Sequence, residues 1–308
     1  MKILIVGGTG FVGFHLCSVL LERGHSVTAL GTAPQWRKIQ HPRFAYVSAD
    51  AALPGAWQQE LTDADAVVNL AGKTIFKRWN AAYKKQIYDS RIRTTRNIVA
   101  GLPHGAPCVL CNTSAVGYYG DRKDEILPET AAPGEGFMAG IAKDWENEAF
   151  AAAEKGIRVA VMRFGIVLGK DGGAMAQMLP AFRRFVGGPL GNGRQWFPWI
   201  HIQDLLSAVE HLLETTSLSG PFNFSAPNPV RNQELAATLG RLLGRPSFLP
   251  APRAMLRLVL GEVGTVLVES QRAVPHNLLQ SGFNFRFPEI EAALQDLVHQ
   301  PADRPEQP

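Results

Sequence analysis

The chain has 308 residues, of which 46% are hydrophobic and 19% are charged, as in a globular protein with a sizeable core. Its 31 basic and 27 acidic residues are spread along the sequence and leave a net charge of +4, so we expect neither nucleic acid nor a membrane as a partner. The first apolar run is too short for a signal peptide. Three cysteines exclude a disulfide scaffold and favour a reducing, cytoplasmic compartment.

The first 170 residues alternate strand and helix patterns. Helical spacing of apolar residues predicts helices at 10–24, 79–102 and 137–149, and strand-like apolar runs lie at 2–8, 25–30, 44–50, 64–72, 108–117 and 157–169. Strands separated by helices of this length pair in parallel, so the pattern predicts an α/β protein with a Rossmann fold, a doubly wound parallel sheet. Cys108 and Cys111 fall on opposite faces of one strand, as core residues rather than a redox or metal pair.

The pattern changes after residue 170. We assign 1–170 to a dinucleotide-binding Rossmann domain, which also receives the segments near 199–226. Residues 171–298 form a smaller, mostly helical C-terminal region on the substrate side. We expect the proline-containing tail 299–308 to be disordered.

The sequence VGGTGFVG places Gly7, Gly10 and Gly13 directly after the first strand and at the start of the first helix. Gly7 permits a tight turn, Gly10 lets the backbone approach a pyrophosphate, and Gly13 lets the helix pack close to the sheet. The free N–H groups of the helix then bind the phosphates. In this strand–turn–helix context the pattern predicts a dinucleotide site.

The residues after the second strand bear on which dinucleotide binds. A carboxylate there would bind the ribose of NAD, but no acid occurs before Asp50. Arg37 and Lys38 follow within a few residues and either contact a 2′-phosphate or belong to a solvated loop. Asp50 either binds the adenine amino group or caps its strand. We therefore expect NADP(H) rather than NAD(H).

Longer motifs carry a more specific resemblance. They are NLAG (69–72), NTSAVGYYG (112–120), RFGIVLG (163–169), GGPLGNGRQWFPWIHIQDL (187–205) and SQRAVPHNLLQSGF (270–283). With the glycine turn, they make the chain resemble the extended short-chain dehydrogenase/reductases, and in particular the atypical "epimerase family protein" subfamily, over residues 1–298. The resemblance implies a Rossmann domain that binds NADP(H) and a substrate cleft covered by a C-terminal domain of unknown function.

The resemblance also implies cofactor-binding residues. The pyrophosphate loop matches at Gly7, Gly10, Phe11, Val12 and Gly13, the segment beside the adenosine at Leu70, Ala71 and Gly72, and the segment beside the nicotinamide at Arg163, Phe164 and Gly165. Relatives commonly have arginine after the second strand, where this chain has Thr32. This departure weakens selectivity for NADP without restoring the carboxylate typical of NAD.

The catalytic groups of the superfamily are only partly present. Ser114 fits the serine that holds the substrate oxygen, and Lys143 fits the lysine one helical turn after the catalytic tyrosine. The tyrosine position itself holds Ala139. Within the resemblance this loss is typical of the subfamily, and Trp145 and Glu146 are an alternative anchor for the helix.

Several side chains are candidates for the missing acid. Tyr118 and Tyr119 follow Ser114 closely, and we favour them over His201. Asp144 and Glu146 lie on the helix. Each has a structural alternative: packing for the tyrosines, a buried ion pair for Glu146, and a tie between loop and helix for His201 with Asp204.

Aromatic residues gather in the loop motifs. Trp79, Trp196, Trp199 and His201 are candidates for lining a substrate cleft, and Phe197 lies among them, although core packing explains at least two equally well. Arg78 and Arg194 flank this set and either bind an anionic substrate or are solvated. No metal-ligand pattern is present.

Three hypotheses follow. The first is an NADP(H)-dependent oxidoreductase acting on an unknown small molecule. The second, a nucleotide-sugar epimerase or dehydratase, normally depends on the missing tyrosine. The third is a cofactor-binding sensor without turnover, which Ala139 favours. By analogy with related folds, the long helix at 80–101 is a candidate homodimer face.

Overall fold

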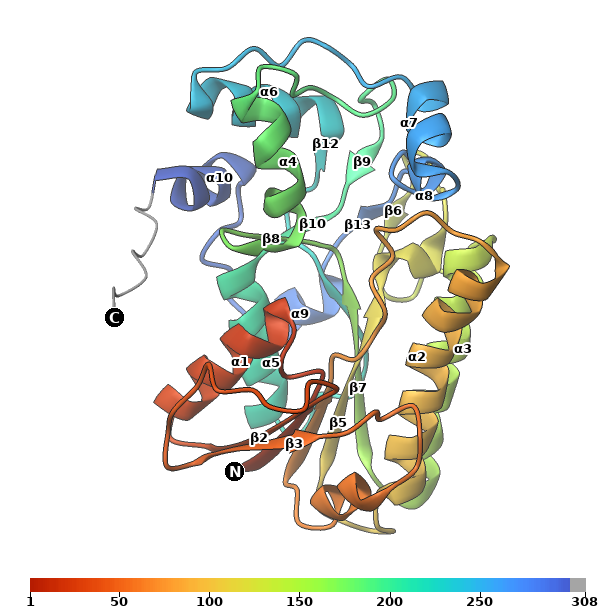
Figure 1. Cartoon of the computed structure of the whole chain (residues 1–308), viewed down its shortest axis with the longest axis vertical. Helices are drawn as coiled ribbons and strands as arrows, with labels where there is room; N and C mark the ends of the chain where they lie inside the picture. The colour runs from red at the N-terminus through yellow and green to blue at the C-terminus, as the bar shows by residue number, and fades with distance from the viewer. Residues whose placement is uncertain (300–308) are drawn as a thin grey trace.

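A computed structural model describes residues 1–299 of the protein. Its centre is a seven-stranded parallel sheet in the order β11-β7-β5-β4-β1-β2-β3 (Figure 1). The strands are β1 (Lys2–Val6), β2 (Ser26–Gly31), β3 (Phe44–Ser48), β4 (Ala66–Asn69), β5 (Val109–Ala115), β7 (Arg158–Phe164) and β11 (Gly220–Phe224). The order runs outward from β1 in both directions, which confirms the predicted doubly wound Rossmann fold.

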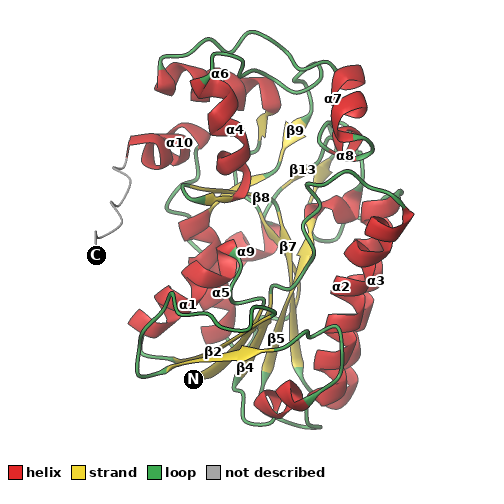
Figure 2. Ribbon diagram, in the orientation of Figure 1, coloured by secondary structure: helices red, strands yellow, loops and turns green. Residues whose placement is uncertain are grey.

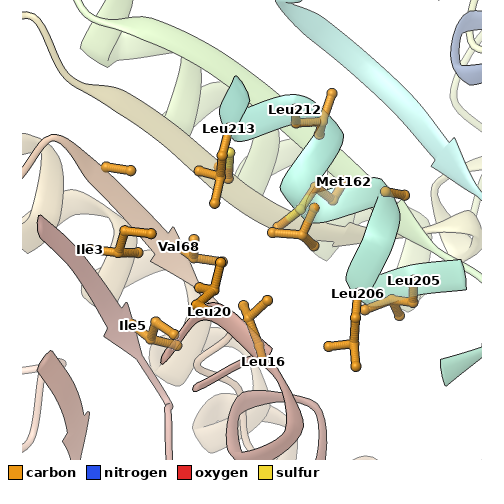
Figure 3. Packing of buried hydrophobic residues seen from close by; sticks show 14 of the residues in the cluster. Ile3, Ile5, Leu16, Leu20, Val68, Met162, Leu205, Leu206, Leu212 and Leu213 are labelled. Carbon is orange, nitrogen blue, oxygen red and sulfur yellow. The ribbon is translucent and has the colours of Figure 1, made fainter. Parts of the chain in front are cut away.

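Helices cover both faces of this sheet. On one face lie α1 (Phe11–Glu22) and α5 (Ile202–Glu214), and on the other α2 (Ala81–Gly101) and α3 (Phe137–Phe150), side by side (Figure 1). Alternate strand residues serve the two faces, because successive side chains point in opposite directions. Ile3 and Ile5 therefore pack toward α1 and α5, as Figure 3 shows, whereas Leu4 packs on the other side. Cys108 and Cys111 likewise belong to clusters on opposite faces.

The predicted single strand at 157–169 is wrong in its second half. It divides into β7 and β8 (Ile166–Gly169), and β8 pairs with β10 (Trp199–His201) outside the central sheet. Gly165 lies at the break, where a Cβ atom would be only 2.8 Å from the carbonyl oxygen of Pro198. The close approach of that segment turns the chain out of the sheet, which an apolar run alone does not reveal.

The remaining elements gather at the end of the molecule toward which β7 runs (Figure 2). Small two-stranded sheets join β9 (Trp196–Phe197) to β12 (Val230–Arg231), and β6 (Ile126–Leu127) to β13 (Arg272–Ala273). The helices are α4 (Gly173–Arg183), α6 (Asn232–Leu243), α7 (Arg253–Leu260), α8 (Val263–Val266), α9 (His276–Gln280) and α10 (Ile290–His299), and short 3₁₀ turns occupy Ala56–Leu61, Val116–Tyr119 and Ala151–Lys155.

The C-terminal helices have their own apolar core between α4, α6 and α10. The strand β11 lies far along the chain but forms an edge of the central sheet. Within residues 1–299 no helix is both long and apolar enough to cross a membrane. The tail predicted at 299–308 lies outside the described residues, except that His299 ends α10.

Candidate functional site

The glycine turn has the close approaches that its sequence predicts. Gly7 has a φ of +83°, and a Cβ atom there would lie 3.0 Å from the backbone nitrogen of Ala71. A Cβ atom at Gly13 would lie 2.5 Å from the carbonyl oxygen of Gly7. Helix α1 begins at Phe11 without a side-chain cap, so its first N–H groups are open to an anionic ligand. Backbone atoms thus form a cradle that any side chain would fill.

The neighbouring predicted residues frame this turn. Phe11 packs against Gly169 and Gly172, where an added Cβ atom would lie 2.5 and 2.2 Å from its ring, and Val12 follows it, half-buried, on α1. The segment Leu70–Gly72 lies directly after β4 and contacts Gly7. The structure therefore brings the ends of β1 and β4 together around one crevice.

The residues expected at the adenosine end lie at an open edge. Thr32 directly follows β2, and both Thr32 and Arg37 are exposed. Asp50, also exposed, accepts a hydrogen bond of 3.0 Å from the backbone of Ala52. This bond is the strand-end cap that the sequence offered as the alternative for Asp50. Two side chains, and no carboxylate directly after β2, therefore surround the place of a 2′-phosphate.

Ser114 lies at the end of β5 and is held by a buried carboxylate. Its hydroxyl donates to Glu146 Oε1 at 2.6 Å. Arg163, next in the sheet on β7, binds the same carboxylate with two bonds, Nε to Oε1 at 2.9 Å and Nη2 to Oε2 at 2.8 Å. All three side chains are buried. Burial alone would lower the pKa of Arg163, but the bonds from Glu146 raise it above the ordinary arginine value.

The two tyrosines after Ser114 have different surroundings. The Tyr119 hydroxyl is buried, accepts from Arg163 Nη1 at 2.8 Å and donates to Asn223 Oδ1 at 2.8 Å. Burial raises the pKa of Tyr119 to about 12. Tyr118 is half-buried, and its ring lies 3.7 Å from the Arg163 guanidinium carbon. Burial raises the pKa of Tyr118 as well, so Tyr118 is the protonated, accessible hydroxyl beside the Ser114 array.

Helix α3 does not bring Lys143 to Ser114. Lys143 is exposed, whereas the inward face of the helix carries Ala142, Trp145 and Glu146. The register therefore turns Glu146 toward the serine, one helical turn after an alanine. The ion-pair alternative for Glu146 is present, and Asp144 accepts from Tyr88 at 3.0 Å, away from Ser114.

The predicted substrate-lining set divides. Trp199 is fully buried in the C-terminal core, so the prediction that it lines a cleft is corrected. His201 is also buried: its Nδ1 caps α5 by accepting from Gln203, its ring packs 4.0 Å from Phe287, and burial lowers its pKa. Its tie between loop and helix is structural. Phe197 is likewise buried in that core.

The other two tryptophans lie closer to open surface. Trp196 is half-buried between Arg231 and Arg272, whose guanidinium carbons lie 4.6 and 4.4 Å from its ring. Trp79 packs on Phe137 and borders a cavity of about 120 Å³ at the start of α3. Three carboxylates also border this cavity: Glu135, Glu262 and Glu269.

Sequence comparison decides the family. The model for the NAD dependent epimerase/dehydratase family matches residues 3–223, and a domain of unknown function, DUF1731, matches 251–297. The chain belongs to the NAD dependent epimerase/dehydratase family. The resemblance to its "epimerase family protein" branch is confirmed, because the relatives below carry that name.

Relatives of this branch match over nearly the whole chain. Epimerase family protein SDR39U1 homolog, chloroplastic, from Arabidopsis thaliana is 38% identical, covering 97% of this chain and 87% of the relative. Epimerase family protein YfhF from Bacillus subtilis is 38% identical, with 99% of both chains covered. The human epimerase family protein SDR39U1, solved with NADPH, has a TM-score of 0.86 at 34% identity, covering 97% of this chain and 99% of that one.

More distant structures show the fold alone. UDP-glucuronic acid 4-epimerase from Bacillus cereus, in complex with a substrate analogue and NAD, has a TM-score of 0.79 at 16% identity, covering 97% of this chain and 99% of that one. The residues that sequence reasoning did not single out are Arg163 as the ionic partner of Glu146, and Arg91 on α2. The signal for Arg163 was a charged residue within the buried run VAVMRFG, which requires a partner.

Proposed function

We propose that the protein is an NADP(H)-dependent oxidoreductase that interconverts a carbonyl and an alcohol on a small molecule. The observation that carries this proposal is the array of Ser114, Glu146 and Arg163 with Tyr118 beside it, at the same edge of the sheet as the glycine turn. Ligands of doubly wound folds bind at this edge, outside the carboxyl ends of the strands.

The residues present fit a dinucleotide. The backbone cradle at Gly7 and Gly13 admits a pyrophosphate that any Cβ atom would exclude. NADP(H), when bound, supplies or accepts the hydride. The absence of a carboxylate directly after β2, the exposed Thr32 and Arg37, and the NADPH bound by the human relative support NADP(H) over NAD(H).

The protein's own groups hold the substrate oxygen and move its proton. Ser114 donates its proton to Glu146, so the oxygen lone pairs remain available to accept from a substrate hydroxyl. Arg163 keeps Glu146 ionised and fixed, which orients the serine. Tyr118, whose raised pKa keeps it protonated, donates a proton to the carbonyl oxygen during reduction. These roles replace the standard tyrosine and lysine pair.

Cofactor binding tests the first part of this proposal. NADPH and NADH are titrated into the purified protein while nucleotide fluorescence is followed. We expect tighter binding of NADPH, lost in Gly10→Asp, because a carboxylate would occupy the phosphate cradle. Gly55→Asp is the matched control, since Gly55 lies exposed before a 3₁₀ turn with only a 3.6 Å contact to an added Cβ. No binding of either nucleotide would refute the proposal.

Two other functions remain as rivals. A nucleotide-sugar epimerase would bring a diphosphate to the cleft, yet the cavity at the start of α3 carries Glu135, Glu262 and Glu269, which repel it. A sensor that binds NADP(H) without turnover is favoured by Ala139 and by the exposed Lys143. A null phenotype fully complemented by Ser114→Ala and Tyr118→Phe would favour the sensor.

We also propose a cytoplasmic location and a homodimer. The three cysteines are buried as free thiols, and such thiols suit a reducing compartment. The exposed residues of α2 would supply the dimer face. Cell fractionation checks the first point, and light scattering during size-exclusion chromatography checks the second.

A further inference from the structure

Arg91 is an enclosed cation on the face of α2 that packs toward the sheet. Its Nη1 donates to the carbonyl oxygens of Lys73 at 3.1 Å and Ile87 at 3.0 Å. Its guanidinium carbon lies 5.2 Å from the centre of the Trp145 ring. The residue as a whole is partly exposed, but its guanidinium is enclosed closely enough that burial lowers the pKa of Arg91 to about 10.

The charge of Arg91 is not balanced by an acid. Among residues 1–299 no carboxylate forms an ion pair with it, and the only charge effect on it comes from Tyr83. Arg163 shows the usual solution, two bonds to one buried carboxylate. Enclosing a cation without such a partner is costly. This is the state expected of a receptor whose anion arrives with a ligand.

The position of Arg91 indicates which ligand. A Cβ atom at Gly72 would lie 3.1 Å from the Arg91 guanidinium, and one at Gly7 would lie 3.0 Å from the nitrogen of Ala71. Two successive residues after β4 therefore connect the guanidinium to the glycine turn. That turn presents the free N–H groups of α1, the place of a pyrophosphate.

We propose that Arg91 is a phosphate-binding residue whose guanidinium binds an oxygen of the dinucleotide pyrophosphate. This inference rests on the proposed function, which supplies the dinucleotide. The Nε and Nη2 groups, which α2 and Lys73 leave without a bond, are the donors. A bound pyrophosphate would then be held from the glycine turn and from α2 together.

A simpler role for Arg91 would be to tie residues 72–73 to α2. Ser90 makes such a tie as well, because its hydroxyl accepts from the backbone of Lys73 at 3.0 Å. The two roles differ in a measurable way. A structural tie stabilises the protein without ligand, whereas an unbalanced enclosed cation does not, and an apolar side chain of similar length there is neutral or stabilising.

The test compares Arg91→Met with Ser90→Ala and with Arg93→Met, an exposed position on the same helix. Melting temperature without nucleotide, and NADPH affinity at low and high salt, are measured on the full chain. For Arg91→Met we expect an unchanged or higher melting temperature, NADPH affinity lower by about tenfold or more, and weaker salt dependence. The two controls keep their NADPH affinity within about twofold.

Each outcome decides one question. If the wild type does not bind NADPH, the proposed function fails, and this inference fails with it. If the wild type binds and Arg91→Met binds equally well, only the role of Arg91 is overturned. A melting temperature lowered in Arg91→Met, with an affinity loss matched by Ser90→Ala, would assign Arg91 to the structural tie instead.

Discussion

Removing the Glu146 carboxylate should leave a buried cation without its partner. In Glu146→Ala, Arg163 stays buried and loses both bonds of 2.9 and 2.8 Å. Breaking a buried pair from one side costs about 3–5 kcal/mol. Unfolding entropy scales with chain length at about 2.1 cal/mol/K per residue, so for this chain the melting temperature should fall by about 5–8 °C.

Urea unfolding of Glu146→Ala, Arg163→Met and the double variant measures this coupling. We expect the double variant to be less destabilised than the sum of the single variants by about 2 kcal/mol or more, because each single change strands a partner. Glu148→Ala is the control on the same helix, since its pair with Arg96 is largely exposed and should contribute about 1 kcal/mol or less. Additive effects, or a loss in Glu146→Ala no larger than in Glu148→Ala, would refute the reasoning.

Three further predictions concern single side chains. Tyr118→Phe should lower kcat about a hundredfold with NADPH affinity unchanged, as steady-state kinetics and titration would show; unchanged kcat would remove Tyr118 from the proton transfer. Gly13→Ala should abolish nucleotide binding, because its Cβ would lie 2.5 Å from the Gly7 carbonyl oxygen; NADPH fluorescence checks this, and retained affinity would contradict it. Burial raises the pKa of Glu269 from 4.5 to about 7, so the folded state holds this proton where the unfolded chain has lost it, and stability falls as pH rises through that window. Glu269→Gln should remove that fall and be more stable above pH 7 by about 1 kcal/mol; parallel pH profiles in urea unfolding would contradict this.

Much of the fold is encoded locally and was predictable. The strand of Lys2–Val6, the glycine turn and the helix from Phe11 each have a period and a composition that specify their geometry. The break at Gly165 was not, because it depends on the backbone of Pro198, more than thirty residues away. Trp199 illustrates the same limit, since a motif cannot tell a cleft wall from a core residue.

The catalytic array was predictable only in part. Ser114 follows from its place at a strand end, but the choice between Lys143 and Glu146 depends on how α3 is rotated against β5. Spacing alone measures positions relative to one another, not relative to the sheet. Arg91 was within reach, because it shares a helical face with the buried residues Ile87 and Ile98, and a cation on such a face requires explanation.

The most direct test is whether bound NADPH is consumed. The protein is loaded with NADPH and mixed with a panel of small carbonyl compounds, and the nicotinamide absorbance is followed in the wild type, Ser114→Ala and Tyr118→Phe. The account predicts oxidation of NADPH by at least one class of carbonyl, slowed by both substitutions while NADPH affinity is kept. Tight NADPH binding with no oxidation across the panel, or oxidation equally fast in both variants, would contradict it.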